Sequence, residues 1–426
     1  MSFEIEDGIL KAYHPEPREE SITIPENVKV IGKSAFRDCW ELKKIIIPDG
    51  VAEIQDFAFS QCTALEHIFI PASVHHIGKR AFHSGVTLSV ENPVYEVIDN
   101  IIYQRNPKRL ICGTSLQPDV VRIPEGTEEI ADFSFEDVPI RELYIPASVS
   151  LIGRRVFCQV QEIHVDEKNP CYTVQDNVLY DKEIKTLLFC AEETAFLPES
   201  VKEITDFAFR NVGDIKSIRL PDGVTHVGNF AFWCGNMKEI FYRDMHFKTQ
   251  EIITRIVEKN TDKRISQQIH NFIYDTDQNH SQVSEEEYSA QEAQYSDFEM
   301  LMIKIIHALM QIAVNRNFDF PCPDFIKYLI MMQMFSHYPE DTDLIQAFQK
   351  QMSAFFPFFA EQEDKISTLQ KILDERKFIT KHNIDDLIVW TIEHKEYDLQ
   401  LMLMDYKEKY IGYDSDDEII RRKFDL

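Results

Sequence analysis

The sequence is short of positive charge. Its 426 residues contain 72 Asp and Glu against 45 Lys and Arg, which gives a formal net charge of −27. A chain this acidic repels the phosphates of nucleic acids and the anionic surface of a membrane, so neither is expected as a partner. The ordinary interpretation of such a balance is solubility, and a dedicated basic partner is the alternative.

Long apolar runs and export signals are also missing. No run approaches the roughly 18 consecutive apolar residues that a membrane-spanning helix needs. The first residues lack a basic flank followed by about seven or more apolar residues, which is the pattern of a secretory signal. We therefore expect cytoplasmic residence. The alternative is that an export signal precedes Met1, which would place the protein at the cell surface or outside the cell.

Short motifs of catalysis and metal binding are absent as well. The sequence has no Cys-x-x-Cys pair, no glycine-rich phosphate loop, no Gly-x-Ser-x-Gly elbow and no His-Glu-x-x-His helix. Zinc, redox and common catalytic sites therefore lack local support. The pair His75-His76 has no third ligand nearby, and residues 414–418 lack the glycine of an EF-hand loop. We expect no enzymatic activity, no cofactor and no metal, although a site assembled from distant residues stays open.

What the sequence does contain is a short motif that ends in proline and recurs at a fixed interval. Pro25, Pro48 and Pro71 are 23 residues apart, and each closes an extended triplet such as Ile-Thr-Ile or Ile-Phe-Ile. Further copies end at Pro124, Pro146, Pro198 and Pro221. A fixed period between about 20 and 30 residues indicates a solenoid, in which each coil buries its apolar side against its neighbours.

Each proline is followed by a second set of fixed positions. In the first copy they are Val28, Ile31, Gly32, Ala35, Phe36, Cys39 and Leu42. The triplet has period two, so its outer residues point inward and its middle residue points outward, and the proline ends the strand. The recurring glycine predicts a corner with a positive φ or a close backbone contact. We expect Phe36, Phe59 and Phe82 to stack in one ladder with steps of about 5 Å.

The pattern I-x-I-P-x-x-V-x-x-I-G-x-x-A-F-x-x-C-x-x-L, nearly complete over residues 22–42 and 45–65, resembles the BspA-like (Treponema pallidum-type) leucine-rich repeat. The resemblance covers residues from about 20 to 243. It implies a solenoid of about 23-residue coils with short parallel strands. It also implies bacterial relatives, some of which are surface proteins that bind host matrix proteins. Cys39 and Cys62 share one repeat position, so we interpret them as buried free thiols.

Two stretches interrupt the period in the same way. Residues 90–103 and 165–180 each carry an Asn-Pro pair and then an Asp-Asn pair between extended segments. Asp-Asn between apolar runs favours a hairpin turn, so each stretch predicts a hairpin-bearing coil rather than a domain break. Similar inserts occur in the family that the repeat resembles. Residues 3–10 echo this hairpin and are expected to cover the first open edge of the solenoid.

After Tyr242 the repeat disappears and helical spacing of apolar residues takes over. We predict an α+β chain: a leucine-rich-repeat solenoid with an N-terminal cap (1–246), capping helices (247–274), an acidic linker (275–296), an all-α module (297–413) and an acidic tail (414–426). The methionines of the module are interpreted as core residues rather than a promiscuous groove. Residues 384–409 weakly resemble an ankyrin-type helix pair and lack the Thr-Pro-Leu-His turn of that family.

The candidate binding surface is the outward residue of each triplet. These residues are Thr23, Ile46, Phe69, Arg122, Tyr144, Phe196 and Arg219, with His164 added by the second hairpin-bearing coil. A solvated row is normally polar, so the apolar and aromatic members indicate a protein contact, and strand propensity is the alternative.

We therefore predict a non-catalytic scaffold that binds a protein or peptide partner. The identity of the partner and the oligomeric state of the protein stay open. The alternatives are a surface adhesin that binds a host matrix protein, and an enzyme or regulator whose activity lies in the helical module. A cleft with converging titratable groups in that module would favour the second alternative.

Overall fold

The computed structural model describes most of the chain. The described residues are 2–16, 18–37, 39–60, 62–83, 85–114, 118–191, 197–210, 212, 215–233, 237–259, 297–360 and 365–412. The chain divides into two compact units, Met1–Met237 and Lys238–Leu426. Phe196, the predicted linker, the predicted tail and residues 260–274 of the predicted capping helices lie outside the described residues. The predicted boundaries finer than this division stay predictions.

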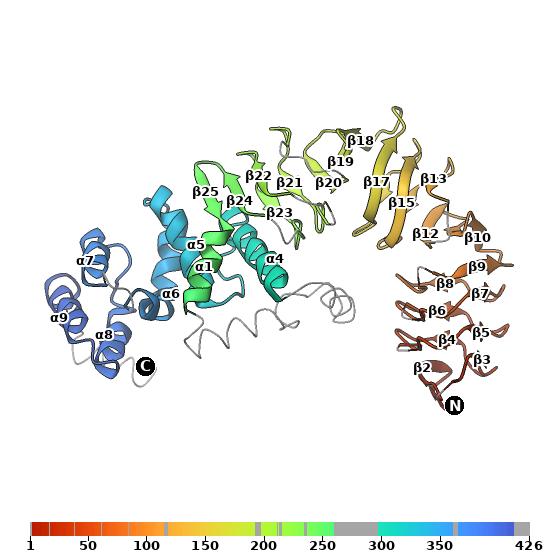
Figure 1. The fold of residues 1–426 in the computed structure, drawn as a ribbon, viewed down its shortest axis with the longest axis horizontal. Coiled ribbons are helices and arrows are strands. Elements are labelled where there is room, and N and C mark those ends of the chain that lie inside the picture. Colours follow the sequence, from red (N-terminus) through yellow and green to blue (C-terminus); the bar gives the residue numbers. More distant parts are fainter. Residues whose placement is uncertain are drawn as a thin grey trace, which may run out of the picture. The chain divides into compact units, whose positions relative to one another are not determined.

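The first unit is a stack of short coils whose triplets form parallel strands in three separate sheets, here together called the triplet ladder (Figure 1). Its strands are β3 (Ser21–Thr23), β5 (Lys44–Ile46), β7 (His67–Ile70), β9 (Thr87–Val90), β13 (Val120–Arg122), β15 (Phe135–Ile145), β17 (Phe157–Val165) and β22 (Ser217–Leu220). The register is the repeat itself, because Ser21 lies opposite Lys44 and Lys44 lies opposite His67, each 23 residues later. The predicted solenoid is confirmed.

The other side of each coil also carries short parallel strands, again in three separate sheets, here together called the second ladder. Its strands are β4 (Val30–Ile31), β6 (Glu53–Ile54), β8 (His76–Ile77), β14 (Glu129–Ile130), β16 (Leu151–Ile152), β21 (Glu203–Ile204) and β23 (His226–Val227). A turn joins the two ladders, because the carbonyl of each repeat proline accepts a hydrogen bond from the N–H three residues later, as from Val28 to Pro25 and from Val51 to Pro48. Proline suits this position, since it fixes φ and has no N–H to leave unpaired.

The phenylalanine ladder is present. The ring centroids of Phe36 and Phe59 are 4.8 Å apart and those of Phe59 and Phe82 are 6.1 Å apart, with nearly parallel planes. Tyr13 continues the ladder at 5.4 Å from Phe36. Tyr13 lies in the hairpin of β1 (Ser2–Glu6) and β2 (Ile9–His14), and β2 pairs in parallel with β4. Residues 2–14 therefore form a hairpin on the first coil, and the Tyr13 ring covers the open end of the apolar interior.

The recurring glycine follows from a close backbone approach and not from a positive φ. A Cβ added at Gly78 would lie 2.4 Å from Asp56 Oδ1, and one added at Gly153 would lie 2.4 Å from Asp132 Oδ1. The aspartate of one coil comes this close because it accepts a hydrogen bond from the N–H that follows the glycine of the next coil, at 2.7 Å for Lys79. Of the two reasons that the sequence left open, the close contact is the correct one.

Both interruptions of the period contain the predicted hairpin. The first holds β10 (Tyr95–Ile98), β11 (Ile101–Gln104) and β12 (Arg109–Gly113), and the second holds β18 (Tyr172–Gln175), β19 (Val178–Asp181) and β20 (Thr186–Cys190). The Asp-Asn pairs form the turns, with φ of 50° and 61° at Asp99 and Asn100. Two consecutive positive φ values match the twist of a hairpin. The hairpins divide the unit into three blocks of coils: residues 2–90, 95–165 and 172–233.

Each joint between blocks is made by the same side chains. Asn92 Nδ2 donates to the carbonyls of Pro71 and Val74 at 2.8 and 2.6 Å, which ties the last turn of the first block to the hairpin. Asn169 repeats this at the second joint, with Nδ2 2.9 Å from the carbonyl of Pro146. The edge of β16 is also closed, because the Tyr172 hydroxyl accepts from the Ile152 N–H at 3.1 Å. The interruptions are thus built joints that keep the blocks in register.

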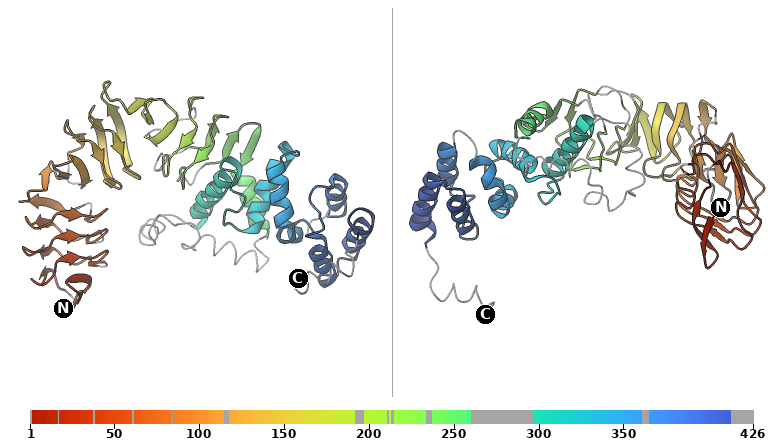
Figure 2. Two further views of the ribbon diagram at one scale, coloured as in Figure 1. Left: turned by 180° about the vertical axis from the view of Figure 1, so that it is seen from behind. Right: turned by 60° about the horizontal axis from the view of Figure 1, so that its bottom comes forward.

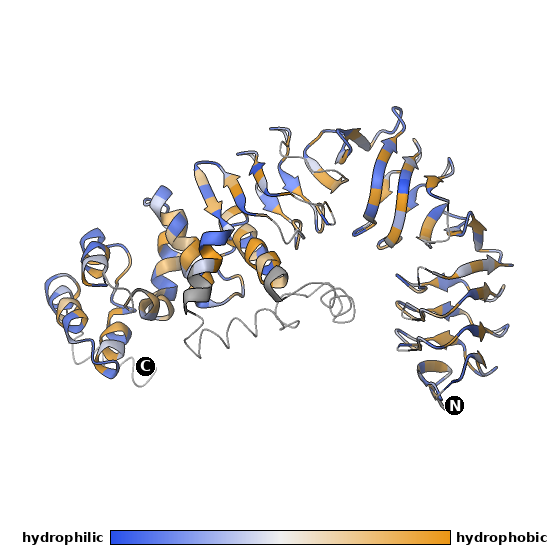
Figure 3. Cartoon of the chain, viewed as in Figure 1, coloured by the Kyte–Doolittle hydropathy of each residue, from blue (hydrophilic) through white to orange (hydrophobic). Residues whose placement is uncertain are grey.

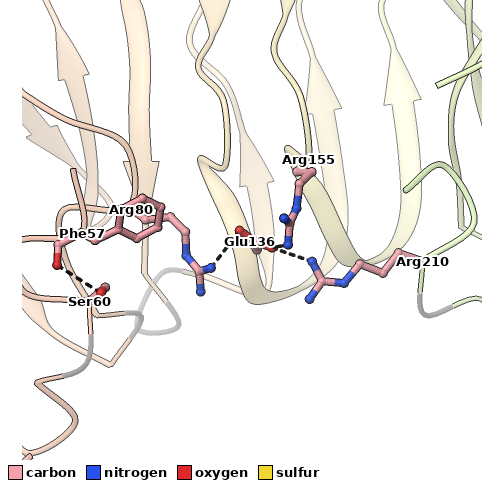
Figure 4. Close-up of polar contacts among 6 residues, drawn as sticks. All are labelled: Phe57, Ser60, Arg80, Glu136, Arg155 and Arg210. Carbon is pink, nitrogen blue, oxygen red and sulfur yellow. Dashed lines mark hydrogen bonds and ion pairs between the residues drawn. The ribbon is translucent and has the colours of Figure 1, made fainter. Parts of the chain in front are cut away.

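One buried carboxylate connects all three blocks (Figure 4). Glu136 is the second residue of β15, its side chain is fully buried, and it lies 3.2 Å from Arg80 of the first block. It also pairs with Arg155 of its own block, and with Arg210 of the third block at 2.5 Å. Burial would raise the pKa of Glu136, but the three guanidinium groups outweigh it and lower the pKa to about 2. The carboxylate is therefore ionised at neutral pH and links coils that are distant in sequence.

The second unit begins with a hairpin of β24 (Glu239–Tyr242) and β25 (Met245–Lys248) and continues with helices. These are α1 (Thr249–Lys259), α4 (Asp297–Leu309), the π-helix η1 (Met310–Val314), α5 (Asp324–His337), α6 (Thr342–Ala360), α7 (Lys365–Glu375), α8 (Ile384–Glu393), α9 (Tyr397–Tyr406) and the π-helix η2 (Lys407–Ile411). Figure 3 shows apolar residues concentrated on α4 and α5. Met300, Met302, Met310, Met331 and Met334 are buried, as the core interpretation predicts, whereas Met332 is only half-buried.

Candidate protein interface

The outward row of the triplet ladder contains adjacent exposed apolar residues in the first block. Thr23 lies directly opposite Ile46, and the register of β5 and β7 places Phe69 next along the row. Ile46 keeps 46% of its surface exposed and Phe69 keeps 42%. Phe69 is followed by Ser89 of β9, which ends the row in this sheet. Ile46 and Phe69 therefore form a pair of adjacent exposed apolar side chains between Thr23 and Ser89.

The inward neighbours of this row hold it rigidly. Ile45 and Ile47 flank Ile46 and are buried, and Ile68 and Ile70 flank Phe69 and are fully buried. Figure 2 shows these strands side by side in the first coils, so each outward side chain stands one strand spacing, about 4.8 Å, from the next. A surface fixed in this way loses little conformational entropy when a partner binds it.

The second block carries a different segment of the same row. Arg122, Tyr144 and His164 lie opposite one another on β13, β15 and β17. The Arg122 guanidinium lies 3.7 Å from the centroid of the Tyr144 ring, which stacks on His164 at 4.4 Å. The Tyr144 hydroxyl donates to Glu142 Oε2 at 2.9 Å and fixes the ring edge. These three predicted residues are brought into one continuous stack of planar groups.

The eight predicted residues do not form one unbroken strip. Arg219 lies on β22 in a third sheet, and among the described residues the sheets of the first two segments end at β9 and β17. Phe196 lies outside the described residues. The structure therefore brings together two groups of three: Thr23, Ile46 and Phe69, and then Arg122, Tyr144 and His164. The joints described above separate them, because each hairpin adds chain between successive triplets.

The sequence prediction left out the second outward residue of each triplet strand. Lys44 lies opposite His67, and His67 Nε2 lies 3.0 Å from Ser89 Oγ. Trp40, in the turn before β5, is 59% exposed and adds a large apolar side chain near the start of that strand. For Lys44 and His67 the sequence held the signal, since each directly precedes its triplet and period two places it on the outward face as well.

The family models now decide the class of the chain. Residues 11–105, 113–196 and 189–254 match the BspA type leucine rich repeat region, in six copies. These matches cover more than half of the chain. The chain belongs to the BspA-type leucine-rich repeat family. The family that the sequence pattern resembles is confirmed, and membership in a repeat family of this kind indicates a role in protein interaction or at a surface.

Several solved structures are similar to the BspA-type repeats. A leucine-rich cell surface protein from Faecalibacterium prausnitzii A2-165 is 25% identical, with a TM-score of 0.39, over 52% of this chain and 59% of that one. The pneumococcal vaccine antigen PcpA is 23% identical, with a TM-score of 0.31, over 55% of this chain and 54% of that one. The chain thus spans somewhat more than half the length of these two relatives. No curated protein matches the sequence.

A cavity of about 460 Å³ lies on the other side of the BspA-type coils, at the second joint. Its walls are Leu151 and Ile152 of β16, Leu188 of β20, and Asp206 beyond β21. Acidic and basic side chains alternate around it, and burial would raise the pKa of Asp132 there, but the hydrogen bond from Lys79 lowers it overall. Asp132 and Asp206 accept backbone hydrogen bonds from the next coil and Glu129 pairs with Arg109, so these carboxylates serve the packing between coils.

Metal and membrane sites find no support in the described parts of the chain. No group of three or more His, Cys, Asp or Glu side chains there is arranged to hold a metal ion. No described helix combines the length and the apolar composition of a membrane span. The outward row of the BspA-type repeats is one surface on which large apolar side chains stay exposed.

Proposed function

We propose that the solenoid unit is a non-catalytic docking scaffold whose outward row binds a protein or an extended peptide. The observation that carries the proposal is the pair Ile46 and Phe69, two exposed apolar side chains on adjacent strands of a rigid ladder. The stack of Arg122, Tyr144 and His164 supports it, because Arg and Tyr are enriched among residues that dominate binding energy. Strand propensity alone does not require exposed apolar residues at both positions.

The two segments suit different parts of one partner. Ile46 and Phe69 gain from burial of apolar surface, at about 25 cal/mol per Å². Arg122, held over the Tyr144 ring, keeps its charge and offers a planar group to a carboxylate or a backbone carbonyl. The partner that fits carries apolar side chains and an acceptor group further along. Cytoplasmic residence belongs to this proposal, and the buried thiols of Cys62 and Cys112 fit a reducing compartment.

The test replaces both apolar residues, in the variant Ile46→Ser with Phe69→Ser. We expect the partner captured by the wild-type protein from its native cells to be lost, at least tenfold, while the melting temperature stays close to wild type. Leu151→Ser is the matched control, since Leu151 is 52% exposed but lies on the second ladder. It should capture the partner normally. Equal capture by the double variant and the wild type would remove the proposed interface.

The helical unit does not favour the enzymatic alternative. One apolar pocket of this unit is lined mainly by aromatic and aliphatic side chains. Lys371 and Glu375 are the charged residues at its edge. One of these two already pairs with a neighbour, because Glu375 Oε2 lies 3.5 Å from Lys377 Nζ. This is not the convergence of titratable groups that acid–base chemistry needs. Docking by the solenoid therefore remains the function that the geometry supports best.

A further inference from the structure

The helical unit contains a partly open pocket of about 310 Å³ lined by three helices. Its walls are Tyr328, Met332 and Phe335 of α5; Phe348, Met352 and Phe355 of α6; Thr368, Lys371, Ile372 and Glu375 of α7; and Phe378. Phe348, Met352 and Phe355 are almost fully buried, so the floor of the pocket is continuous with the core of the unit. The pocket is therefore a defined apolar space and not a shallow surface dent.

The pocket exists because the most apolar face of α7, which carries Leu369 and Leu373, does not line it. The buried residues of α7 are Leu369 and Leu373, and α7 packs against α9 as well as α6. The stripe of α7 that faces the pocket has a threonine, a lysine and a glutamate beside its one aliphatic residue, Ile372. These polar residues cannot fill an aromatic cavity, since their burial without partners would be costly. The space between α7 and the α5–α6 pair stays open as a result.

The mouth of the pocket has two charged side chains, Glu375 and Lys371, and they differ in whether they form ion pairs with the described residues. Glu375 pairs with Lys377, which also lies 2.6 Å from Glu340. Lys371 is exposed and makes no ion pair with any residue that the structure describes. Thr368, one turn earlier on α7, places a hydroxyl on the same rim. An ammonium group and a hydroxyl at the mouth of an apolar pocket complement an anionic head group.

We infer that this pocket binds a small amphipathic molecule with an apolar body and a single anionic head, of the class of a medium-chain carboxylate. Apolar cavities of about 150 Å³ already stay dry and bind benzene, and ligand pockets commonly start near 300 Å³. The body lies among the Phe and Met side chains of α5 and α6. The head lies at Lys371 and Thr368. The inference is independent of the docking role of the solenoid.

Calorimetric titration of the full chain with sodium decanoate tests the inference. Decanoate is expected to bind at millimolar or lower concentration and to raise the melting temperature. Decylamine, with the opposite head charge, is expected to bind at least tenfold more weakly.

Lys371→Gln should weaken the binding of decanoate at least fivefold and leave the binding of decanol unchanged. Thr368→Trp fills the mouth and should abolish binding of both. Lys350→Gln is the matched control, since Lys350 of α6 does not line the pocket and pairs with Asp319 at 2.7 Å, and this variant should bind as wild type.

Three outcomes overturn the inference. They are the absence of decanoate binding, binding that survives Thr368→Trp in a variant with a wild-type circular dichroism spectrum, and tighter binding of decylamine than of decanoate. If Thr368→Trp fails to fold, the contrast between Lys371→Gln and Lys350→Gln decides alone. Equal affinities in these two variants then contradict a head group held by Lys371.

Discussion

Glu136→Gln is expected to lower the free energy of unfolding of the solenoid unit by about 3–5 kcal/mol. The substitution keeps the size of the side chain but removes the negative charge that Arg80, Arg155 and Arg210 share. Three guanidinium groups then face one another around a neutral amide. Because they come from three blocks of coils, the loss should loosen both joints at once, and amide exchange should rise on each side of β15.

The same carboxylate predicts a pH dependence. Its pKa is lowered to about 2 in the folded chain from an ordinary value of 4.5. The unfolded chain therefore takes up this proton at a higher pH than the folded chain does. The stabilisation, roughly 3 kcal/mol, is fully present above pH 4.5 and is lost as the pH falls from there toward 2. The difference between wild type and Glu136→Gln should shrink over the same range.

Native-state hydrogen exchange, read on peptides of the solenoid, measures this effect without interference from the helical unit. Glu20→Gln is the matched control, because Glu20 pairs with Lys43 at 2.8 Å on the exposed surface. An exposed pair of this kind is worth about 1 kcal/mol or less. If Glu136→Gln costs no more than Glu20→Gln, the carboxylate does not hold the blocks together.

Phe59→Ala is expected to cost about 3–5 kcal/mol, whereas Phe69→Ala should cost about 0.5 kcal/mol or less. The two residues are ten positions apart and chemically identical. Phe59 is fully buried and stacks between Phe36 and Phe82, so its removal leaves a cavity and breaks two ring contacts. Phe69 stands on the outward row and is 42% exposed.

Denaturation by urea of both variants, with hydrogen exchange on residues 20–90, gives the two costs. Binding should show the reverse order, because Phe69→Ala removes a proposed contact and leaves the fold intact. Similar losses of stability for the two substitutions would mean that the inward and outward faces of the triplet ladder are wrongly assigned.

The repeat made most of the first unit predictable. Period two in each triplet placed Ile46 outward and Ile45 inward, and the fixed Ala-Phe position predicted the ladder of Phe36, Phe59 and Phe82. These features repeat locally, so each copy supports the assignment of the others. The Asn-Pro and Asp-Asn pairs predicted hairpins for the same reason, since turn chemistry depends on residues adjacent in sequence.

Long-range features were not predictable in this way. Arg80 and Arg155 each precede a ladder phenylalanine by two residues, and Glu136 and Arg210 each directly follow one, but the repeat does not show which of these side chains meet across the joints. The split of the binding row follows from the same joints, whose effect on strand pairing no single repeat contains. In the helical unit, the orientation of α7 depends on whether its apolar face packs against α9 or against the α5–α6 pair. Periodicity shows that α7 has an apolar stripe but not which neighbour receives it.

The most direct test of the docking role places a photoreactive benzoyl-phenylalanine at residue 46 of the full chain in living native cells. Irradiation is expected to yield a discrete cross-linked protein partner from position 46. The same probe at position 151, on the other ladder, should yield none. Cross-links of equal yield and identity from both positions, or none from position 46 in a folded protein, would contradict the claim that the outward row is the binding surface.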